Sequence, residues 1–220
     1  MPTRPHAGTG PPRSVRLPRR RIKAERREEL LQRLEDLFLA EGFGQLTVDD
    51  IAARLQCSKS TLYAVASSKE QLVTAAIKHF FREATRRIEE RITPITSPPE
   101  RIAVYLASVG EEMRRMSPSC YDDMTIFEAT DDIYRLNARA SARRVREFIR
   151  EGVDAGAFRQ VNAEFVGEAV SLLIEGIMHG RLLDRTGLSS GDAYVELSTL
   201  VLHALQTDTP PASGTTETSP

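Results

Sequence analysis

The chain has 220 residues, 40% of them hydrophobic and 28% charged, a length that suffices for one substantial domain or a small domain joined to a larger one. Its two cysteines, Cys57 and Cys120, lie far apart and form no CxxC motif, which argues against a disulfide scaffold or a zinc ribbon. No apolar run reaches membrane-spanning length and the arginines at 19–21 precede charged residues, so we expect a soluble, cytoplasmic protein with no membrane partner.

The formal net charge of −1 hides an uneven distribution. Basic side chains dominate the first 27 residues, where Glu25 is the one acid, and charge gathered at one end is typical of phosphate binding. Residues 1–21 are rich in Pro, Gly and Arg without periodicity, so we expect a disordered basic arm. A solubilising tail is the alternative for its first part. Candidates for contact with DNA phosphates or the minor groove are Arg19, Arg20 and Arg21.

The first helix is predicted over residues 23–41, where large apolar side chains recur at helical spacing. Gly42 follows this segment and is expected to end the helix, because glycine is common just past a helix end. The inward stripe consists of Leu30, Leu34, Leu37 and Phe38.

Residues 47–66 are predicted to form two short helices joined by a tight turn. A capping box at Thr47–Asp50 begins the first helix, and Ser58 is expected to cap the second. In the second helix only Leu62 and Val65 are expected to face the core. Its other face offers small polar groups and one aromatic hydroxyl, which suits insertion into a DNA major groove. These outward residues are Lys59, Ser60, Thr61 and Tyr63.

A long helix is predicted next, from a second capping box at Ser67 and Glu70 to about Arg91. Its apolar stripe runs through Leu72 and Phe80, so we expect it to connect two domains. Prolines at positions 94, 98 and 99 mark its end.

The remainder is predicted to be helical as well, with a tail over 207–220 that is rich in Thr, Pro and Ser and is expected to be disordered. Its last two helices are apolar around most of their circumference, which in a small domain often means that a partner chain covers one face. The whole chain is therefore predicted to be all-α with about nine helices. The five predicted here span 100–115, 121–129, 132–155, 163–184 and 192–205.

Four motifs in order resemble the DNA-binding domain of the TetR family of bacterial transcriptional regulators. They are ELLQRLEDLFLAEGF, T-x-x-D-I-A, S-K-S-T-L-Y and S-K-E-x-L. The resemblance covers about 22–72 closely and the rest of the chain in layout. One departure is Val65 and Ala66, where the family commonly has aromatic residues, and it puts a phosphate contact there in question without affecting the fold.

The resemblance implies a three-helix helix-turn-helix DNA-binding domain over 22–68, a connecting helix over 69–92, and a helical bundle for ligand binding and dimerisation over 93–206. It also implies that Thr47 and Lys69 touch phosphates. For Thr47 a capping role can hold beside this contact, and for Lys69 the alternative is a solvated surface lysine. The candidate DNA-binding set is Thr47, Ser58, Lys59, Ser60, Thr61, Tyr63 and Lys69, with Arg19, Arg20 and Arg21.

The resemblance further implies a ligand pocket formed by helices within about 100–180. Aromatic and methionine side chains suit an irregular apolar cavity, although ordinary core packing is the alternative for each of them. An acidic cluster over 122–132 is interpreted as a solvated loop face, with attraction of a cationic ligand as the alternative. The pocket candidates are Tyr105, Met113, Met116, Met124, Phe127 and Tyr134.

A homodimer face is predicted where Gly176 and Gly180 place small residues one turn apart on a predicted helix, because such a spacing permits close helix approach. The alternative is a kink or a tolerated glycine. The predicted face comprises Leu173, Gly176, Ile177, Gly180, Val201 and Leu205.

No catalytic, metal or cofactor site is expected. Residues 187–191 match the G-x-S-x-G pattern, with His203 downstream, but that motif needs a strand before its serine and here it joins two predicted helices. The four histidines show no ligand spacing.

The sequence therefore predicts a homodimeric regulator, most simply a repressor that a small apolar molecule releases from a palindromic operator in double-stranded DNA. One alternative is a family-like DNA-binding protein without a small ligand, acting through a protein partner or as an activator. Two others are an enzyme, and a domain that dimerises but no longer reads DNA, which only Val65 and Ala66 suggest.

Overall fold

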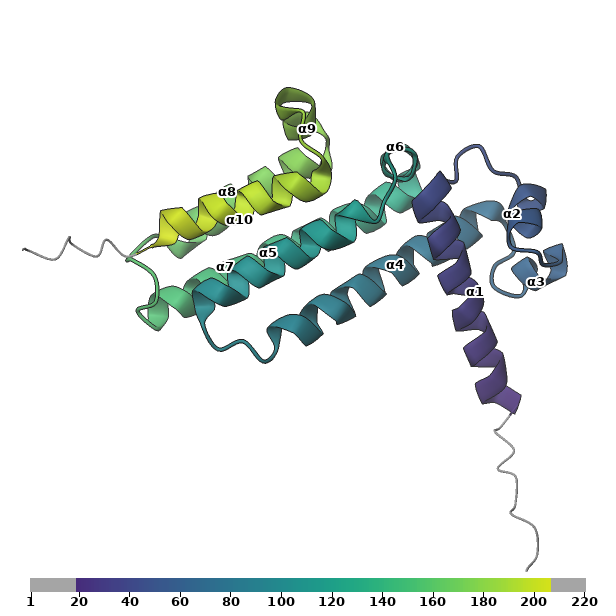
Figure 1. Ribbon diagram of the computed structural model, residues 1–220, viewed down its shortest axis with the longest axis horizontal. Helices are drawn as coiled ribbons and strands as arrows, with labels where there is room; N and C mark the ends of the chain where they lie inside the picture. The colour runs from purple at the N-terminus through teal and green to yellow at the C-terminus, as the bar shows by residue number, and fades with distance from the viewer. Residues whose placement is uncertain (1–18, 207–220) are drawn as a thin grey trace, which may run out of the picture.

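The computed structural model describes residues 19–206, and within that range the chain forms ten helices and no strand (Figure 1). The all-α prediction is confirmed. The predicted basic arm up to residue 18 and the tail over 207–220 lie outside the described residues. The helices are α1 (Arg19–Glu41), α2 (Val48–Arg54), α3 (Lys59–Tyr63), α4 (Lys69–Ile92), α5 (Pro98–Arg114), α6 (Pro118–Ile126), α7 (Glu128–Asp154), α8 (Ala163–Met178), α9 (Arg181–Thr186) and α10 (Ser190–Leu205).

Two predicted boundaries are wrong for identifiable reasons. Helix α1 begins at Arg19, so residues 19–21 belong to a helix and not to a flexible arm; arginine and lysine are good helix formers, which lets the helix extend back this far. The helix predicted over 163–184 is two helices, α8 and α9, because Gly180 between them adopts φ +71°.

The molecule has two parts, with α1–α3 at one end of the long helix α4 and α5–α10 in a bundle beside it, in which α6 lies next to α1 (Figure 1). In the second part α5 packs on α10, and α7 packs on α8. We call residues 19–66 the head and residues 98–206 the bundle. Helix α4 belongs to both, since it packs on α1 as well as on α5 and α7.

The core of the head comes from the predicted apolar stripes. Leu34 and Phe38 of α1 and Leu62 of α3 are fully buried. The first turns of α4 complete this core with Leu72 and Ile77, which are also buried. Because α4 supplies part of the head's core, a movement of α4 must move the head with it.

A charged layer lies between α1, α4 and α5. The Glu35 carboxylate of α1 is fully buried and lies 2.5 Å from Nδ1 of His79 in α4. It also accepts a hydrogen bond of 2.8 Å from the Arg115 guanidinium, just past α5. Buried charges are tolerated where they are paired and hydrogen-bonded, so this layer ties the head to both neighbouring helices.

The head is joined to the bundle a second time through α6. The Asp123 carboxylate accepts hydrogen bonds from the backbone N–H groups of Phe43 (2.6 Å) and Gly44 (2.7 Å). The backbone N–H of Ser117 donates to the carbonyl of Leu39 at 2.8 Å. The acidic residues over 122–132 are interpreted from the sequence as a solvated face, but Asp123 does not belong to such a face. It closes the loop between α1 and α2 against the bundle.

Candidate nucleic-acid interface and ligand cavity

Helix α2 begins with the predicted capping box. The Thr47 hydroxyl oxygen accepts from the backbone N–H of Asp50 at 3.2 Å, and the Asp50 carboxylate accepts from the backbone N–H of Thr47 at 2.9 Å. Hydrogen bonds from Thr47 lower the pKa of the Asp50 carboxyl. The capping role of Thr47 is confirmed, and its phosphate contact stays a prediction.

The turn after α2 contains the one non-glycine residue of the described chain with positive φ, Gln56 at +50°. This left-handed conformation favours glycine, since a Cβ crowds the following carbonyl there. The backbone N–H of Cys57 then donates to the carbonyl of Ala52 at 3.0 Å, which closes the turn. The turn sets the angle at which α3 leaves α2.

Helix α3 presents polar groups to solvent and one leucine to the core. Ser58 caps it by accepting from the backbone N–H of Thr61 at 3.1 Å, as predicted. Leu62 is fully buried, whereas Tyr63 is 48% exposed. Ser60 and Thr61 are exposed, and their hydroxyls lie within 2.9 Å of the Ser58 hydroxyl. Small donors and acceptors on one exposed helix face are the groups that read base edges.

Two lysines of the predicted DNA-binding set have partners within the chain. The Lys59 ammonium pairs with Asp49 at 2.6 Å, and the hydrogen bond to Asp49 raises the pKa of Lys59. The Lys69 ammonium donates to the carbonyl of Gly44 at 2.8 Å. Each ammonium has three donors, so a partner of this kind leaves donors for a phosphate.

Helix α4 begins one residue later than the predicted capping box. Ser68 is the capping residue and accepts from the backbone N–H of Gln71 at 3.2 Å. The side-chain carbonyl of Gln71 accepts from the backbone N–H (3.1 Å) and the hydroxyl (2.7 Å) of Ser67. Gln71, and not Glu70, is therefore the residue that reaches back, and its partner is Ser67, the residue before the cap.

Two further groups of residues from the sequence analysis lie outside the exposed face of α3. Val65 and Ala66 are half-buried and pack against the core, so they contribute apolar contacts at the start of the α3–α4 connection. Arg19, Arg20 and Arg21 lie in the first turn of α1, and their role at DNA stays a prediction.

A cavity of about 260 Å³ lies between α4, α5, α7 and α10. Three of the predicted pocket residues, Tyr105, Met113 and Tyr134, line it. Phe81 and Tyr194 complete its aromatic wall, and neither was predicted, since Phe81 lies on the connecting helix and Tyr194 on the last one. We call this space the effector cavity.

The other pocket candidates do not line the effector cavity. Met116 and Met124 are buried in ordinary core packing. The ring of Phe127 packs edge-on against Phe43 at the junction of head and bundle, with 5.5 Å between ring centres. These residues follow the same apolar pattern as the true lining residues, so composition could not separate them.

The polar groups of the effector cavity differ in how well they are satisfied. The Glu112 carboxylate receives hydrogen bonds from Arg87 at 2.7 Å and from Arg115 at 2.9 Å. By contrast, the hydroxyls of Tyr134 and Ser141 are buried and make no hydrogen bond of good geometry within the described residues, although they interact with the hydroxyls of Tyr121 and Tyr105. Burial raises the pKa of Tyr134 well above its usual value, so its hydroxyl stays neutral.

The outer side of α8 and α10 exposes large apolar side chains that no described residue covers. Phe165, Leu172 and Leu200 are 74%, 60% and 58% exposed. We call these three residues the outer apolar face. A shallow hollow beside them, of about 310 Å³, is lined by Leu173 and Leu188 among others. Exposed apolar patches of this kind mark interaction surfaces.

The predicted dimer face is only partly on this side. Val201 and Leu205 are buried in the chain's own core, and so is Ile177. Gly180 follows the end of α8, so it cannot pair with Gly176 on one helix face. Gly176 faces α9 instead, where a Cβ would lie 3.0 Å from a methyl group of Leu182. Periodicity could not decide which side faces inward, because both helices are apolar on several sides.

The catalytic look-alike serves as a helix cap. The Ser189 hydroxyl caps α10 by accepting from the backbone N–H of Asp192 at 3.2 Å and donates to its carboxylate at 2.6 Å. His203 lies in the last turn of the same helix, about 21 Å away at 1.5 Å per residue. Serine and histidine at that separation cannot act on one substrate atom.

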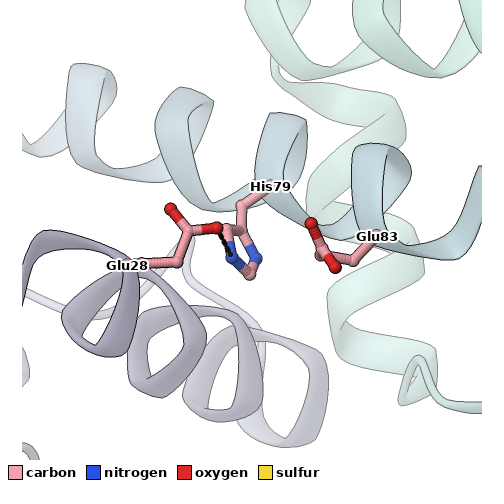
Figure 2. Close-up of side chains that lie close together, drawn as sticks. All are labelled: Glu28, His79 and Glu83. Carbon is pink, nitrogen blue, oxygen red and sulfur yellow. Dashed lines mark hydrogen bonds and ion pairs between the residues drawn. The ribbon is translucent and has the colours of Figure 1, made fainter. Parts of the chain in front are cut away.

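The fold also gathers Glu28, His79 and Glu83, each with one possible metal-ligand atom within 4.8 Å of the others (Figure 2). Glu28 comes from α1, and the other two come from α4. Arg82 pairs with both glutamates, and Arg86 pairs with Glu83 at 2.9 Å. Hydrogen bonds from Arg86 and Arg82 lower the pKa of Glu83. Because arginines already neutralise both carboxylates, this cluster does not call for a cation.

The head and the start of α4 match a known protein family. Residues 30–76 match the sequence model of the family described as bacterial regulatory proteins, tetR family. The chain is 30% identical over 142 residues to the HTH-type transcriptional repressor KstR2 of Mycolicibacterium smegmatis. This match covers 62% of this chain and 69% of that protein. In the described residues, no helix has the length and apolar character needed to cross a membrane.

Solved structures share the whole fold. A transcriptional regulator of the TetR/AcrR family from Thermobifida fusca superposes with a TM-score of 0.60 at 22% identity, over 83% of this chain and 100% of that one. A transcriptional regulator from Saccharomonospora viridis, solved in complex with choline, gives a TM-score of 0.65 at 21% identity, over 83% of this chain and 98% of that one.

Proposed function

The chain belongs to the TetR family of bacterial transcriptional regulators, and on that premise we propose that it is a homodimeric repressor released from a palindromic operator by a small, largely apolar molecule. The carrying observation is the exposed polar face of α3, held outward by buried Leu62. Each subunit would lay α3 in the major groove, with half-sites about 34–36 Å or a multiple of that distance apart. The name of the relative KstR2 supports repression as the direction of control.

The homodimer is supported by the outer apolar face. Phe165, Leu172 and Leu200 lie on α8 and α10, at the side of the bundle away from α4 (Figure 1). A twofold interface brings the same patch of both subunits together, so a self-complementary apolar surface is the expected form. A dimer joined there leaves both heads free to bind one face of DNA.

The small-molecule effector is supported by the effector cavity. Its aromatic wall suits an apolar body, and the buried hydroxyl of Ser141 suits one hydrogen-bonding group on that body. A structural neighbour holds choline, which is a precedent for a small ligand in this fold. Here the carboxylate of Glu112 is already paired with arginines, which favours a neutral occupant over a cation.

Coupling between effector and DNA would run through α4. Phe81 and Ile88 of this helix line the effector cavity, while Leu72 and Ile77 of its first turns form part of the head's core. An effector that fits the cavity better with α4 displaced would lower the population that matches the operator. Its effect is limited by the difference between its affinities for the two states.

The first test is selection of binding sites from random duplex DNA with the purified full chain. We expect a palindromic consensus, and the variant that replaces both Thr61 and Tyr63 by alanine should enrich no such sequence. Enrichment of the same palindrome by that variant would remove α3 from the recognition role. A lack of any consensus for the wild type would favour the alternative in which a protein partner is needed.

The effector is tested separately with Ser141→Leu, which extends an apolar side chain into the cavity. This variant should bind the selected operator with wild-type affinity and should no longer respond to a compound that releases the wild-type protein. If release persists unchanged, the effector binds elsewhere. If no compound class releases the wild type, the ligand-independent alternative, including activation, is favoured.

A further inference from the structure

A row of arginines on α7 lines a groove between α7 and α8, of about 520 Å³. Arg135, Arg139 and Arg143 follow one another at successive helical turns, and Arg146 comes three residues later. Residues three and four apart are neighbours on a helix surface, about 5–6 Å apart between Cβ atoms. We call these four residues and the space they line the arginine groove.

The positive charge of the groove is balanced only in part by the chain itself, where Arg135 pairs with Asp131 at 2.7 Å. Arg139 and Arg143 are exposed and have no hydrogen bond or ion pair within residues 19–206. Arg146 has its nearest carboxylates, those of Glu164 and Glu168, at 3.8 and 3.7 Å, which is beyond hydrogen-bonding distance. The Nε–H of Arg146 is buried and has no partner among the described residues.

Other arginines of α7 are paired with carboxylates, so the unpaired positive charge is confined to the arginine groove. Arg144, on the opposite side of α7, holds Glu89 at 3.0 Å, and Arg150 holds Glu164 at 2.7 Å. Leaving a buried guanidinium N–H without an acceptor costs free energy. The Nε–H of Arg146 therefore lacks an acceptor, whereas the guanidinium groups of Arg144 and Arg150 have found carboxylate partners.

The groove is shaped by a glycine of α8. A Cβ added to Gly167 would lie 2.5 Å from Cγ of Arg146, which shows how closely the stem of this arginine crosses α8. Gly167 is buried, and so the stem fills the space that a side chain would take. This contact holds the Arg146 guanidinium in the groove, whereas a free surface arginine would sample many rotamers.

From these observations we propose that the arginine groove binds a phosphorylated small molecule. Guanidinium forks match phosphate oxygens in pairs, and adjacent arginines one turn apart suit neighbouring phosphoryl groups. Glu168 and Glu175 also line the groove and repel an anion, so the ligand must contact the unpaired guanidinium groups of Arg139 and Arg143 directly. The site is separate from the effector cavity, because the two lie on opposite sides of α7 and share only Ala138 as a lining residue.

The test is isothermal titration calorimetry of the full chain with sodium tripolyphosphate, at an ionic strength held constant with sodium chloride. We expect saturable binding of one tripolyphosphate per subunit. Arg139→Gln with Arg143→Gln should weaken it by roughly tenfold or more, since each removes a charge-assisted contact. The matched control, Arg181→Gln with Arg185→Gln, removes the same charge from exposed positions on α9 and should leave the affinity unchanged.

A conservative change guards against loss of structure. Arg143→Lys keeps the charge but not the planar fork, so it should give an affinity between those of the wild type and the double variant. This single exposed replacement leaves the core untouched.

Several results would overturn the proposal. These are the absence of saturable binding, an equal loss of affinity in the groove and control variants, a wild-type affinity in the groove variant, and its conversion from dimer to monomer in sedimentation. The last result would identify the groove as a subunit contact. A groove variant that keeps tripolyphosphate binding but loses operator affinity would assign the arginines to duplex DNA instead.

Discussion

The exposed face of α3 and the outer apolar face on α8 and α10 differ in chemistry. Helix α3 buries Leu62 and exposes hydroxyls, an ammonium and the ring of Tyr63. The outer apolar face exposes Phe165, Leu172 and Leu200 instead. A polar surface of the first kind is satisfied by water until DNA replaces it, whereas an apolar surface of the second kind gains free energy from being covered at all times.

This difference indicates that a subunit contact at the outer apolar face would be permanent, whereas the contact of α3 with DNA would be conditional. Apolar burial stabilises at about 25 cal/mol per Å² and is not weakened by screening of charges, so the proposed subunit contact should persist as the salt concentration rises. Contacts with phosphates weaken steeply as salt rises. In the proposed dimer, this difference would let the two subunits stay together through each release from DNA.

The largest expected effect is on the permanent contact. Leu172→Arg would place a charge in the subunit interface and should weaken the dimer by about 3 kcal/mol or more, roughly a hundredfold in Kd. Sedimentation velocity would then show monomer at micromolar concentration. The matched control is Leu136→Arg, because Leu136 is 65% exposed on α7, outside the outer apolar face. If both variants remain dimeric, the interface lies elsewhere.

The conditional contact should respond to single changes on α3. Thr61→Ala and Tyr63→Ala should each cost about 1–3 kcal/mol of operator affinity and alter the preferred sequence, since base contacts carry specificity. Lys59→Ala should instead weaken binding to all sequences and reduce the salt slope by about one unit. Binding curves at several salt concentrations separate these outcomes, and a uniform loss for Thr61→Ala would contradict base reading.

The junction between the two parts is tested by Asp123→Ala. Without this carboxylate, the backbone N–H groups of Phe43 and Gly44 lose their acceptor, so the free energy of unfolding should fall by about 1–2 kcal/mol. Urea unfolding measures this loss. Asp122→Ala removes the same charge from a neighbouring exposed position and should have little effect; an equal loss in both variants would assign the effect to net charge.

Acid should weaken the bundle through Glu112. Burial raises the pKa of this carboxyl, but hydrogen bonds from Arg87 and Arg115 outweigh burial and bring the pKa below its usual value of 4.5. The stabilisation is therefore complete above pH 4.5 and is lost as the pH falls through the lower folded-state pKa. Denaturation between pH 3 and 6 should show a shallower decline for Glu112→Gln, and an unchanged pH profile would exclude Glu112 as the cause.

The smallest predicted effect concerns the turn before α3. Gln56→Gly should relieve the left-handed backbone strain and raise the free energy of unfolding by up to about 1 kcal/mol. Gln45→Gly, at a loop position without positive φ, should be neutral or destabilising because glycine has more freedom in the unfolded chain. Thermal unfolding of the two variants decides the sign.

The head was more predictable than the bundle. Its caps at Thr47 and Ser58, its buried Leu62 and its polar α3 face all follow from residues within a few positions of one another. The cap of α4 was off by one residue because Ser67 and Ser68 both offer a hydroxyl. In the bundle, Tyr105, Met113 and Tyr134 reach the effector cavity, but Met116, Met124 and Phe127 carry the same pattern without reaching it.

By itself the sequence determined the all-α class, the order of the motifs and the polar face of α3, because capping bonds and apolar stripes act within one or two helical turns. Only the tertiary structure decided which sides of α8 and α10 face inward, since both are apolar on several sides. It also decided that Asp123 binds Phe43 across 80 positions and that the Nε–H of Arg146 finds no acceptor in the described residues. Contacts of that range depend on how whole helices pack, which no local pattern encodes.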